Sequence, residues 1–139
     1  MLGEKLGSES GHVTGRRVLP ADDFRFMKME ISFESTGEVL GVQMQDLGTY
    51  VVFERGPGQI YGEGQGILMT ADGDGVIWNG HGVGRVGPDG SIAFAASVAF
   101  QTSSAKLARL NESLAVVEHH AHADGHTHSD LWFWTVPDH

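Results

Sequence analysis

The chain has 139 residues, a length that fits one domain with a sizeable core. Glycine supplies 20 residues and proline only four, while hydrophobic residues make up 40%, so the composition is that of a folded protein and excludes collagen and proline-rich disorder. Nine Lys and Arg against 18 Asp and Glu give a net charge of −9, and no Lys or Arg follows Arg109, so nucleic acid is not an expected partner.

The chain has no cysteine, which excludes disulfides, thiol catalysis and thiolate metal ligands and leaves oxygen and imidazole chemistry. No signal-peptide core and no apolar run of about 18 residues is present, so we expect no membrane span and a cytoplasmic location. Residues 1–10 are expected to form a disordered or extended N-terminal tail, and residues 11–139 a single domain.

Alternation of apolar and polar residues predicts strands along most of the chain. The first is expected over 12–19, and a second over 27–34 ends at a turn formed by Ser35, Thr36 and Gly37. The stretch 38–54 is predicted to be one long strand with a bulge at Gly48. Gly-rich turns then separate strands over 59–69, 76–86 and 91–102.

The segment 103–111 (SSAKLARLN) breaks this pattern, because it offers a Ser N-cap, good helix formers, and Leu107 and Leu110 three residues apart. It predicts about two turns of helix. A last hairpin follows over 114–123 and 126–136. Eight or nine long antiparallel strands favour an all-β fold, an antiparallel eight-stranded β-barrel with this one short helix, and a two-sheet sandwich is the alternative.

The strand over 91–102 is apolar on both faces, since Ile92, Phe94 and Val98 alternate with Ala93 and Ala95. A strand that is buried on both sides needs a second cover. We therefore expect a homo-oligomer in which the outer face packs against a neighbour.

The most distinctive segment is the glycine hairpin, residues 61–85. A turn centred on Gly73 predicts three rungs of facing glycines on one face, which Trp78 and aliphatic residues border, so we expect that face to line the interior. Six glycines together imply sharp curvature or the close approach of a bulky group, which is either a Trp or Phe side chain of the barrel or a bound ligand. The predicted pairs are Gly66 with Gly80, Gly64 with Gly82 and Gly62 with Gly84.

The other face of the glycine hairpin carries Glu63 and His81, a carboxylate and an imidazole suited to proton transfer, with Tyr61 nearby. These three residues are the candidate catalytic groups, and the alternative is that they lie on a solvated outer face. A dinucleotide-binding loop is excluded, because residue 67 is Ile where the motif needs Gly and no helix follows.

The histidine hairpin, residues 118–130, carries five of the eight histidines. A turn centred on Asp124 places four of them on one face, where they could bind a divalent transition metal such as Zn²⁺, Ni²⁺ or Cu²⁺. The alternative is an exposed hairpin tip with incidental metal affinity, and no cofactor is required; the spacing of a cupin metal site is not met. The candidate metal ligands are His120, His122, His126 and His128.

Trp132 and Trp134 lie on the same face as these imidazoles in the predicted register. If that face lined the lumen, the two indoles would be natural partners for the glycine groove. The candidate ligand-binding residues are therefore the six paired glycines with Trp78, Trp132 and Trp134.

The succession of hairpins, above all the Tyr-Gly-Glu-Gly-Gln-Gly strand before a Gly-rich partner, resembles the small bacterial barrels grouped with allene oxide cyclases and dirigent proteins. The resemblance extends from about residue 11 to about residue 136 and lies in architecture and glycine patterning. It implies a dimer or trimer and an apolar lumen that binds or folds a hydrophobic substrate without a metal. No catalytic residue matches position by position, so no activity transfers.

Two functions follow from these patterns. The first, which we favour, is a binding module whose lumen holds a small apolar ligand, with the helix near Leu107 covering one end. The second is an isomerase or cyclase type of enzyme in which Glu63, His81 or Tyr61 moves a proton. A lumen filled by Trp and Phe would instead leave a structural oligomer with an incidental His-rich metal site.

Overall fold

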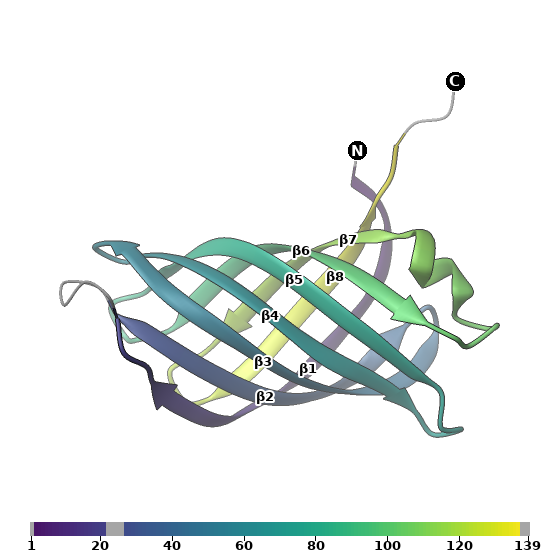
Figure 1. Ribbon diagram of the computed structural model, residues 1–139, viewed down its shortest axis with the longest axis horizontal. Helices are drawn as coiled ribbons and strands as arrows, with labels where there is room; N and C mark the ends of the chain where they lie inside the picture. The colour runs from purple at the N-terminus through teal and green to yellow at the C-terminus, as the bar shows by residue number, and fades with distance from the viewer. Residues whose placement is uncertain (1, 22–26, 137–139) are drawn as a thin grey trace.

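The computed structural model describes residues 2–21 and 27–136 and shows a closed barrel of antiparallel strands (Figure 1). Each strand pairs with the next along the chain, and the last strand pairs with the first, which confirms the predicted barrel and excludes the sandwich. The elements are β1 (Leu2–Val18), β2 (Lys28–Val39), β3 (Val42–Gly56), β4 (Gln59–Thr70), β5 (Gly75–Val86), β6 (Ile92–Thr102), the 3₁₀ turn η1 (Ala108–Glu112), β7 (Leu114–Ala121) and β8 (His126–Trp134).

The first strand begins at Leu2, so most of the segment expected to be an extended or disordered tail is part of the barrel wall. Residues 7–12 pair with β2 on one side and with β8 on the other. A Cβ atom added at Gly7 would lie 1.9 Å from the backbone oxygen of Glu38. The absence of a side chain at Gly7 therefore lets β1 approach β2 closely.

The second strand runs through the predicted turn at residues 35–37 and ends at Val39. The chain reverses instead at Leu40 and Gly41, which both have positive φ angles, of 54° and 73°. The predicted bulge at Gly48 is also wrong, because β3 passes Gly48 without a register shift against β2 or β4. Position 48 favours glycine for another reason, because an added Cβ would lie 2.6 Å from the ring of Phe33.

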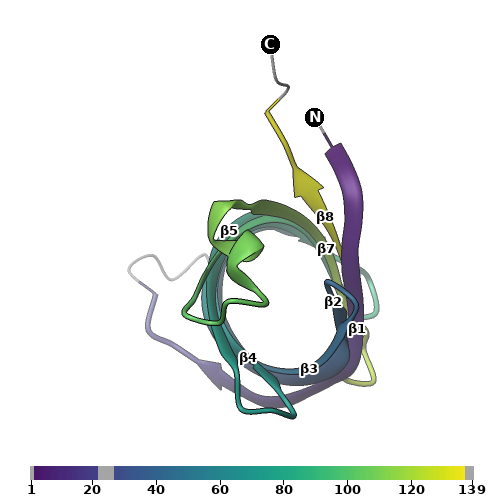
Figure 2. The ribbon, with the colours of Figure 1, turned by 90° about the vertical axis from the view of Figure 1, so that its right-hand side faces the viewer.

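The predicted helix over 103–111 is a single 3₁₀ turn, η1, whose first residue is Ala108. No side chain caps its start, and Asn111 is held against the end of β6 by two hydrogen bonds to the Thr102 backbone, so an α-helix does not develop. Leu107 and Leu110 are fully buried and lie in the core with residues of the strands. Figure 2 shows this segment over part of the barrel rim, so it does cover one end, as expected for the predicted helix.

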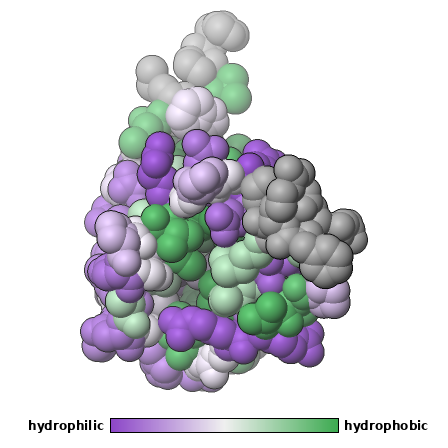
Figure 3. Space-filling view, turned by 90° about the vertical axis from the view of Figure 1, so that its left-hand side faces the viewer, coloured by the Kyte–Doolittle hydropathy of each residue, from purple (hydrophilic) through white to green (hydrophobic). Residues whose placement is uncertain are grey.

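The inner faces of the strands form two hydrophobic clusters. One includes Leu107 and Leu110 at the end covered by η1, and the other is built on residues such as Ile31, Val52 and Ile60. Figure 3 looks onto the other end of the barrel, where hydrophobic side chains gather around the centre of the face.

The outer face carries an apolar row, in which Leu47, Ile67 and Ile77 lie side by side on β3, β4 and β5 and are each more than a third exposed. The expected homo-oligomer stays a prediction, which sedimentation of the purified protein tests. Among the described residues, no helix has the length and apolar character that crossing a membrane requires.

Candidate functional site

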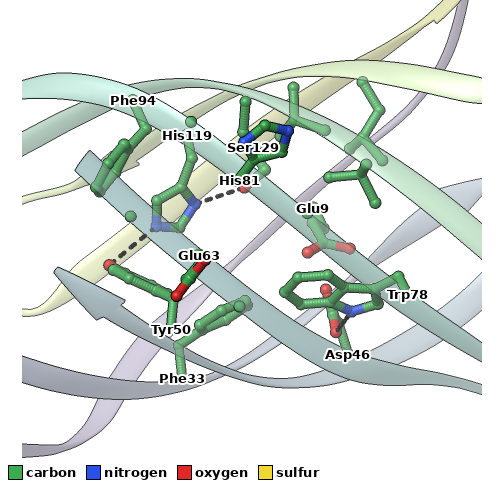
Figure 4. A pocket seen from close by; sticks show the side chains of 18 of the residues that line it. Glu9, Phe33, Asp46, Tyr50, Glu63, Trp78, His81, Phe94, His119 and Ser129 are labelled. Carbon is green, nitrogen blue, oxygen red and sulfur yellow. Dashed lines mark hydrogen bonds between the residues drawn. The ribbon is translucent and has the colours of Figure 1, made fainter.

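A cavity of about 100 Å³ lies in the barrel lumen (Figure 4). Its size is that of about three water molecules at ~30 Å³ each, well below the ~300–1,000 Å³ of pockets for drug-sized ligands, so it suits only a small ligand. The aromatic part of its wall comes from Phe33, Tyr50, Trp78, Phe94 and Phe100.

The glycine hairpin forms one side of this cavity, as expected for the face that lines the interior, but its register differs from the predicted one by two residues. Thr70 and Asp74 close the turn with two hydrogen bonds. The backbone N–H of Thr70 donates to the backbone carbonyl oxygen of Asp74, and the backbone N–H of Asp74 donates to the Thr70 hydroxyl. The turn is therefore centred on Asp72 rather than Gly73. The observed pairs are Gly62 with Gly82, Gly64 with Gly80, Gly66 with Trp78 and Ile60 with Gly84.

Side chains of the barrel fill part of the glycine groove. A Cβ at Gly66 would lie 2.4 Å from the Trp78 indole, and one at Gly62 would lie 2.9 Å from the Phe94 ring. Gly64 and Gly80 line the cavity itself. At those two positions an added Cβ would lie 2.6 Å from the backbone oxygen of Thr49 and 2.5 Å from that of Ser97. A ring thus occupies the groove at some rungs, whereas at Gly64 and Gly80 the glycines permit the close approach of a neighbouring strand beside the cavity.

A pair of carboxyl groups, Glu9 and Asp46, lines the cavity at one end (Figure 4). Both side chains are buried, at 7% and 5% exposure, and they are hydrogen bonded to each other. The Trp78 indole N–H donates to Asp46 Oδ1 over 2.8 Å. Glu9 is on β1 and Asp46 on β3, and the strand between them presents Gly37, where an added Cβ would lie 2.8 Å from the Glu9 Cβ.

Burial governs the protonation of this carboxyl pair. Loss of water raises the pKa of Glu9 to about 10, and the hydrogen bond to Asp46 and the charge of Asp46 add to the rise. Burial also raises the pKa of Asp46, but there the hydrogen bonds from Glu9 and Trp78 oppose the rise. Burial thus favours a proton shared by the pair, and because the Trp78 N–H donates to Asp46, we assign the proton to Glu9, which donates it to the Asp46 carboxylate.

A second polar group in the lumen is the neutral chain formed by Tyr50, His119 and Ser129. The Tyr50 hydroxyl lies 3.4 Å from His119 Nε2, and His119 Nδ1 lies 2.7 Å from the Ser129 hydroxyl. Burial lowers the pKa of His119 to about 4 and raises the pKa of Tyr50 to about 12, so both rings are uncharged near neutral pH. The ring of Phe33 connects the two polar groups, with its centroid 5.5 Å from that of His119 and 6.3 Å from that of Trp78.

The candidate catalytic residues Tyr61, Glu63 and His81 are brought together, but on the outer face of the barrel. Glu63 is directly opposite His81 across the β4–β5 ladder, and both are exposed. The Tyr61 hydroxyl lies 3.4 Å from His81 Nδ1. The alternating glycines occupy the inner positions of both strands, so the three residues lie at outer positions, where Glu63 and His81 are exposed and Tyr61 is half-buried. Glu63 and His81 also border the cavity beside these glycines (Figure 4).

The register predicted for the histidine hairpin is observed, with His120 opposite His128. The hairpin's histidine face is outside the barrel, however, and within residues 2–21 and 27–136 no group of three His, Asp or Glu side chains is placed to hold a metal. His128 lies instead 2.8 Å from the Ser10 hydroxyl and 3.1 Å from Asp130, and His126 lies 2.8 Å from Asp124. A metal bound by this hairpin stays a prediction.

Trp132 and Trp134 do not reach the glycine groove. They lie on the outer face with the histidines, and Trp134 is 49% exposed. Of the three tryptophans predicted to bind a ligand, Trp78 alone lines the cavity. The cause is the alternation of β8, in which Leu131 and Phe133 take the buried inner positions.

Four titratable residues of the lumen were missed from the sequence, although two of them had a visible signal. Asp46 has the same parity in β3 as the apolar Met44, and His119 has the opposite parity to the other histidines of its strand. Glu9 gave no signal, because it lies in a polar segment without alternation. Tyr50 also gave no signal of a polar role, because a tyrosine in a strand is ordinarily a packing residue.

Solved structures with the same barrel fold are known, each covering nearly all of the chain. A protein of unknown function from Clostridium acetobutylicum ATCC 824 aligns with a TM-score of 0.79 at 15% identity, over 95% of this chain and 98% of its own. A β-barrel like protein from Acinetobacter baumannii AYE gives a TM-score of 0.79 at 17% identity, over 96% and 94% of the two chains.

A conserved protein of unknown function from Rhodopseudomonas palustris gives a TM-score of 0.76 at 16% identity, over 96% of this chain and 97% of its own. At these identities the likeness shows the fold alone. No family model and no curated protein matches the chain.

Proposed function

We propose that the protein binds one small molecule with an apolar body in the lumen of its barrel. The observation that carries the proposal is the cavity, which aromatic rings surround and which the glycines of β4 and β5 leave open on one side. An eight-stranded barrel that served only as a scaffold would fill this space with side chains. The proposed resemblance to allene oxide cyclases and dirigent proteins agrees with an apolar lumen ligand.

The polar groups of the cavity favour binding over a purely structural role. Glu9, Asp46 and His119 are all buried, and placing such groups in a core lowers stability unless each is hydrogen bonded. They face one shared space rather than being dispersed among apolar neighbours. Such convergence of a few polar groups on an apolar cavity is typical of ligand sites.

An isomerase type of enzyme is a second candidate, and the carboxyl pair is the observation that favours it. A protonated Glu9 beside an ionised Asp46 offers a proton donor and a proton acceptor to one bound molecule. In such an enzyme the buried carboxyl pair replaces Glu63, His81 and Tyr61 as the acid and base, because those three lie at outer positions of β4 and β5.

The binding proposal is tested by filling the cavity. We expect isobutanol, a neutral probe of five non-hydrogen atoms, to bind at one saturable site, seen as shifts of the Trp78 indole N–H resonance. Ala96→Leu places a larger side chain on the cavity wall and should abolish this binding. Ala95→Leu, on the exposed outer face of the same strand, is the matched control and should retain it. Absence of saturable binding in the wild type would overturn the proposal.

A further inference from the structure

We propose that the lumen site takes a small alkylammonium ion, with Asp46 as the residue that receives its N–H groups. This inference rests on the proposed function and adds the chemical class of the ligand. It starts from a cavity whose wall combines aromatic rings with one buried carboxyl pair (Figure 4).

The acceptor capacity of Asp46 exceeds its supply of donors. An ionised carboxylate has about four acceptor sites on its two oxygens. The structure provides two donors, the Trp78 indole N–H and the protonated Glu9 carboxyl. Asp46 lines the cavity, where a ligand with several N–H donors would complete its remaining acceptor sites.

The charge of the carboxyl pair has no counter-charge in the cavity wall. All residues that line the cavity belong to the described part of the chain, and none of them is Lys or Arg. The other titratable residues of the lining are Tyr50 on β3 and His119 on β7, which burial keeps neutral, and Glu63 and His81, which border the cavity from exposed outer positions of β4 and β5. Arg16, at an exposed position on β1, acts on Tyr50. A cationic ligand would supply the missing charge.

The aromatic wall suits the same ligand. The Trp78 indole N–H donates to Asp46, and the Trp78 ring lies beside that of Phe33, with centroids 6.3 Å apart. A cation held at Asp46 is therefore within reach of aromatic faces, which attract cations through their quadrupoles. The rest of the wall, including Val98 and Phe100, provides apolar contact for an alkyl body.

Size limits the ligand further. A cavity of about 100 Å³ is smaller than the ~150 Å³ engineered cavity that accepts benzene, so an aromatic amine would need the wall to move. Isobutylammonium has five non-hydrogen atoms and the shape of isobutanol, so the two probes differ in charge and donors but hardly in volume. The pair separates recognition of the amine from occupancy of the lumen.

The test compares these two probes by titration at pH 7.5, followed by the Trp78 indole N–H resonance and by calorimetry. We expect the wild type to bind isobutylammonium at least tenfold more tightly than isobutanol. Asp46→Asn should remove this preference while isobutanol still binds. Glu38→Gln removes an exposed carboxylate of β2 that does not line the cavity and should retain the preference.

Four results would overturn the inference. Equal affinity of the wild type for both probes would refute it and leave the proposed function intact, whereas binding of neither probe would refute both. A loss of preference in Glu38→Gln equal to that in Asp46→Asn would show that surface charge alone is responsible. If Asp46→Asn does not fold, the wild type is titrated at falling pH, where protonation of Asp46 should remove the preference for isobutylammonium; a preference that persisted throughout would refute the inference.

Discussion

The two polar groups of the lumen respond to the same burial in opposite ways. In the chain of Tyr50, His119 and Ser129, every member is satisfied while neutral, and burial keeps His119 unprotonated. In the pair of Glu9 and Asp46, burial favours the protonated acid, yet one negative charge is retained because two donors converge on Asp46. The difference shows that hydrogen-bond donors, rather than depth, decide which buried group remains charged.

The comparison extends to the pH dependence of stability. Between pH 4.5 and about 10, the folded state holds a proton on Glu9 that the unfolded state has lost, so the free energy of unfolding falls as pH rises. Between pH 6.5 and about 4, the unfolded state holds a proton that His119 lacks in the folded state, so stability falls as pH decreases. The two effects oppose each other below pH 6.5, and above it Glu9 acts without this opposition.

The largest expected effect comes from Glu9→Gln, which removes the titrating carboxyl but keeps a donor for Asp46. One proton of difference corresponds to about 1.4 kcal/mol per pH unit, so the variant should gain about 4 kcal/mol over the wild type between pH 6.5 and 9.5. Urea denaturation across this range measures the gain. Glu38→Gln, an exposed carboxyl change on β2, is the control and should follow the wild type. A constant difference between Glu9→Gln and the wild type would contradict the assignment of the proton to Glu9.

A smaller effect is expected on the acid side from His119→Gln. The wild type should lose stability relative to this variant by somewhat more than ~2 kcal/mol between pH 6.5 and 4.5, because only the wild type takes up a proton at residue 119 on unfolding. The same denaturation series at acid pH measures it. His120→Gln changes the next residue along β7, which is exposed, and should show little of this trend. Equal trends in the two variants would mean that His119 is not kept neutral by burial.

The smallest effect tests how the carboxyl pair is brought together. Gly37→Ala introduces a Cβ 2.0 Å from the Ser8 oxygen and 2.8 Å from the Glu9 Cβ, so we expect a loss of about 2 kcal/mol at neutral pH. Gly75→Ala points into open space and should change stability by less than about 0.5 kcal/mol. Thermal and urea unfolding of both variants measure the loss of stability. Similar losses in the two variants would show that the lack of a side chain at Gly37 is not what brings the carboxyl pair together.

Much of the barrel was predictable, because a period of two is a local property of the sequence. Strand positions and the register of the histidine hairpin follow from alternation and from a turn centred on Asp124. The glycine hairpin shows the limit of this reasoning, since the hydrogen bonds of Thr70 and Asp74 moved the turn and shifted every pair by two residues. A shift by two preserves which face is inside, so the inner face was correct although the partners were not.

The site was harder to predict than the fold, because it depends on strands that are distant in the sequence. Glu9 and Asp46 meet across β2 only because Gly37 leaves room between them, and no local pattern reports that contact. The polar clusters that are evident in the sequence, around His81 and around His120, lie at exposed positions, where many polar residues can gather without a cost in stability. Isolated polar residues at inner positions, such as Asp46 and His119, were the more informative signal.

The closure of β1 on β8 has a consequence for how the protein becomes functional. The contact between Ser10 and His128 joins residues 118 positions apart, so β1 acquires its second partner only when β8 has been made. Ser129 and Leu131 of β8 line the cavity, so the proposed ligand site is complete only at that stage. Binding of the proposed ligand would therefore follow synthesis of β8, and a chain truncated before β8 would lose part of the cavity wall.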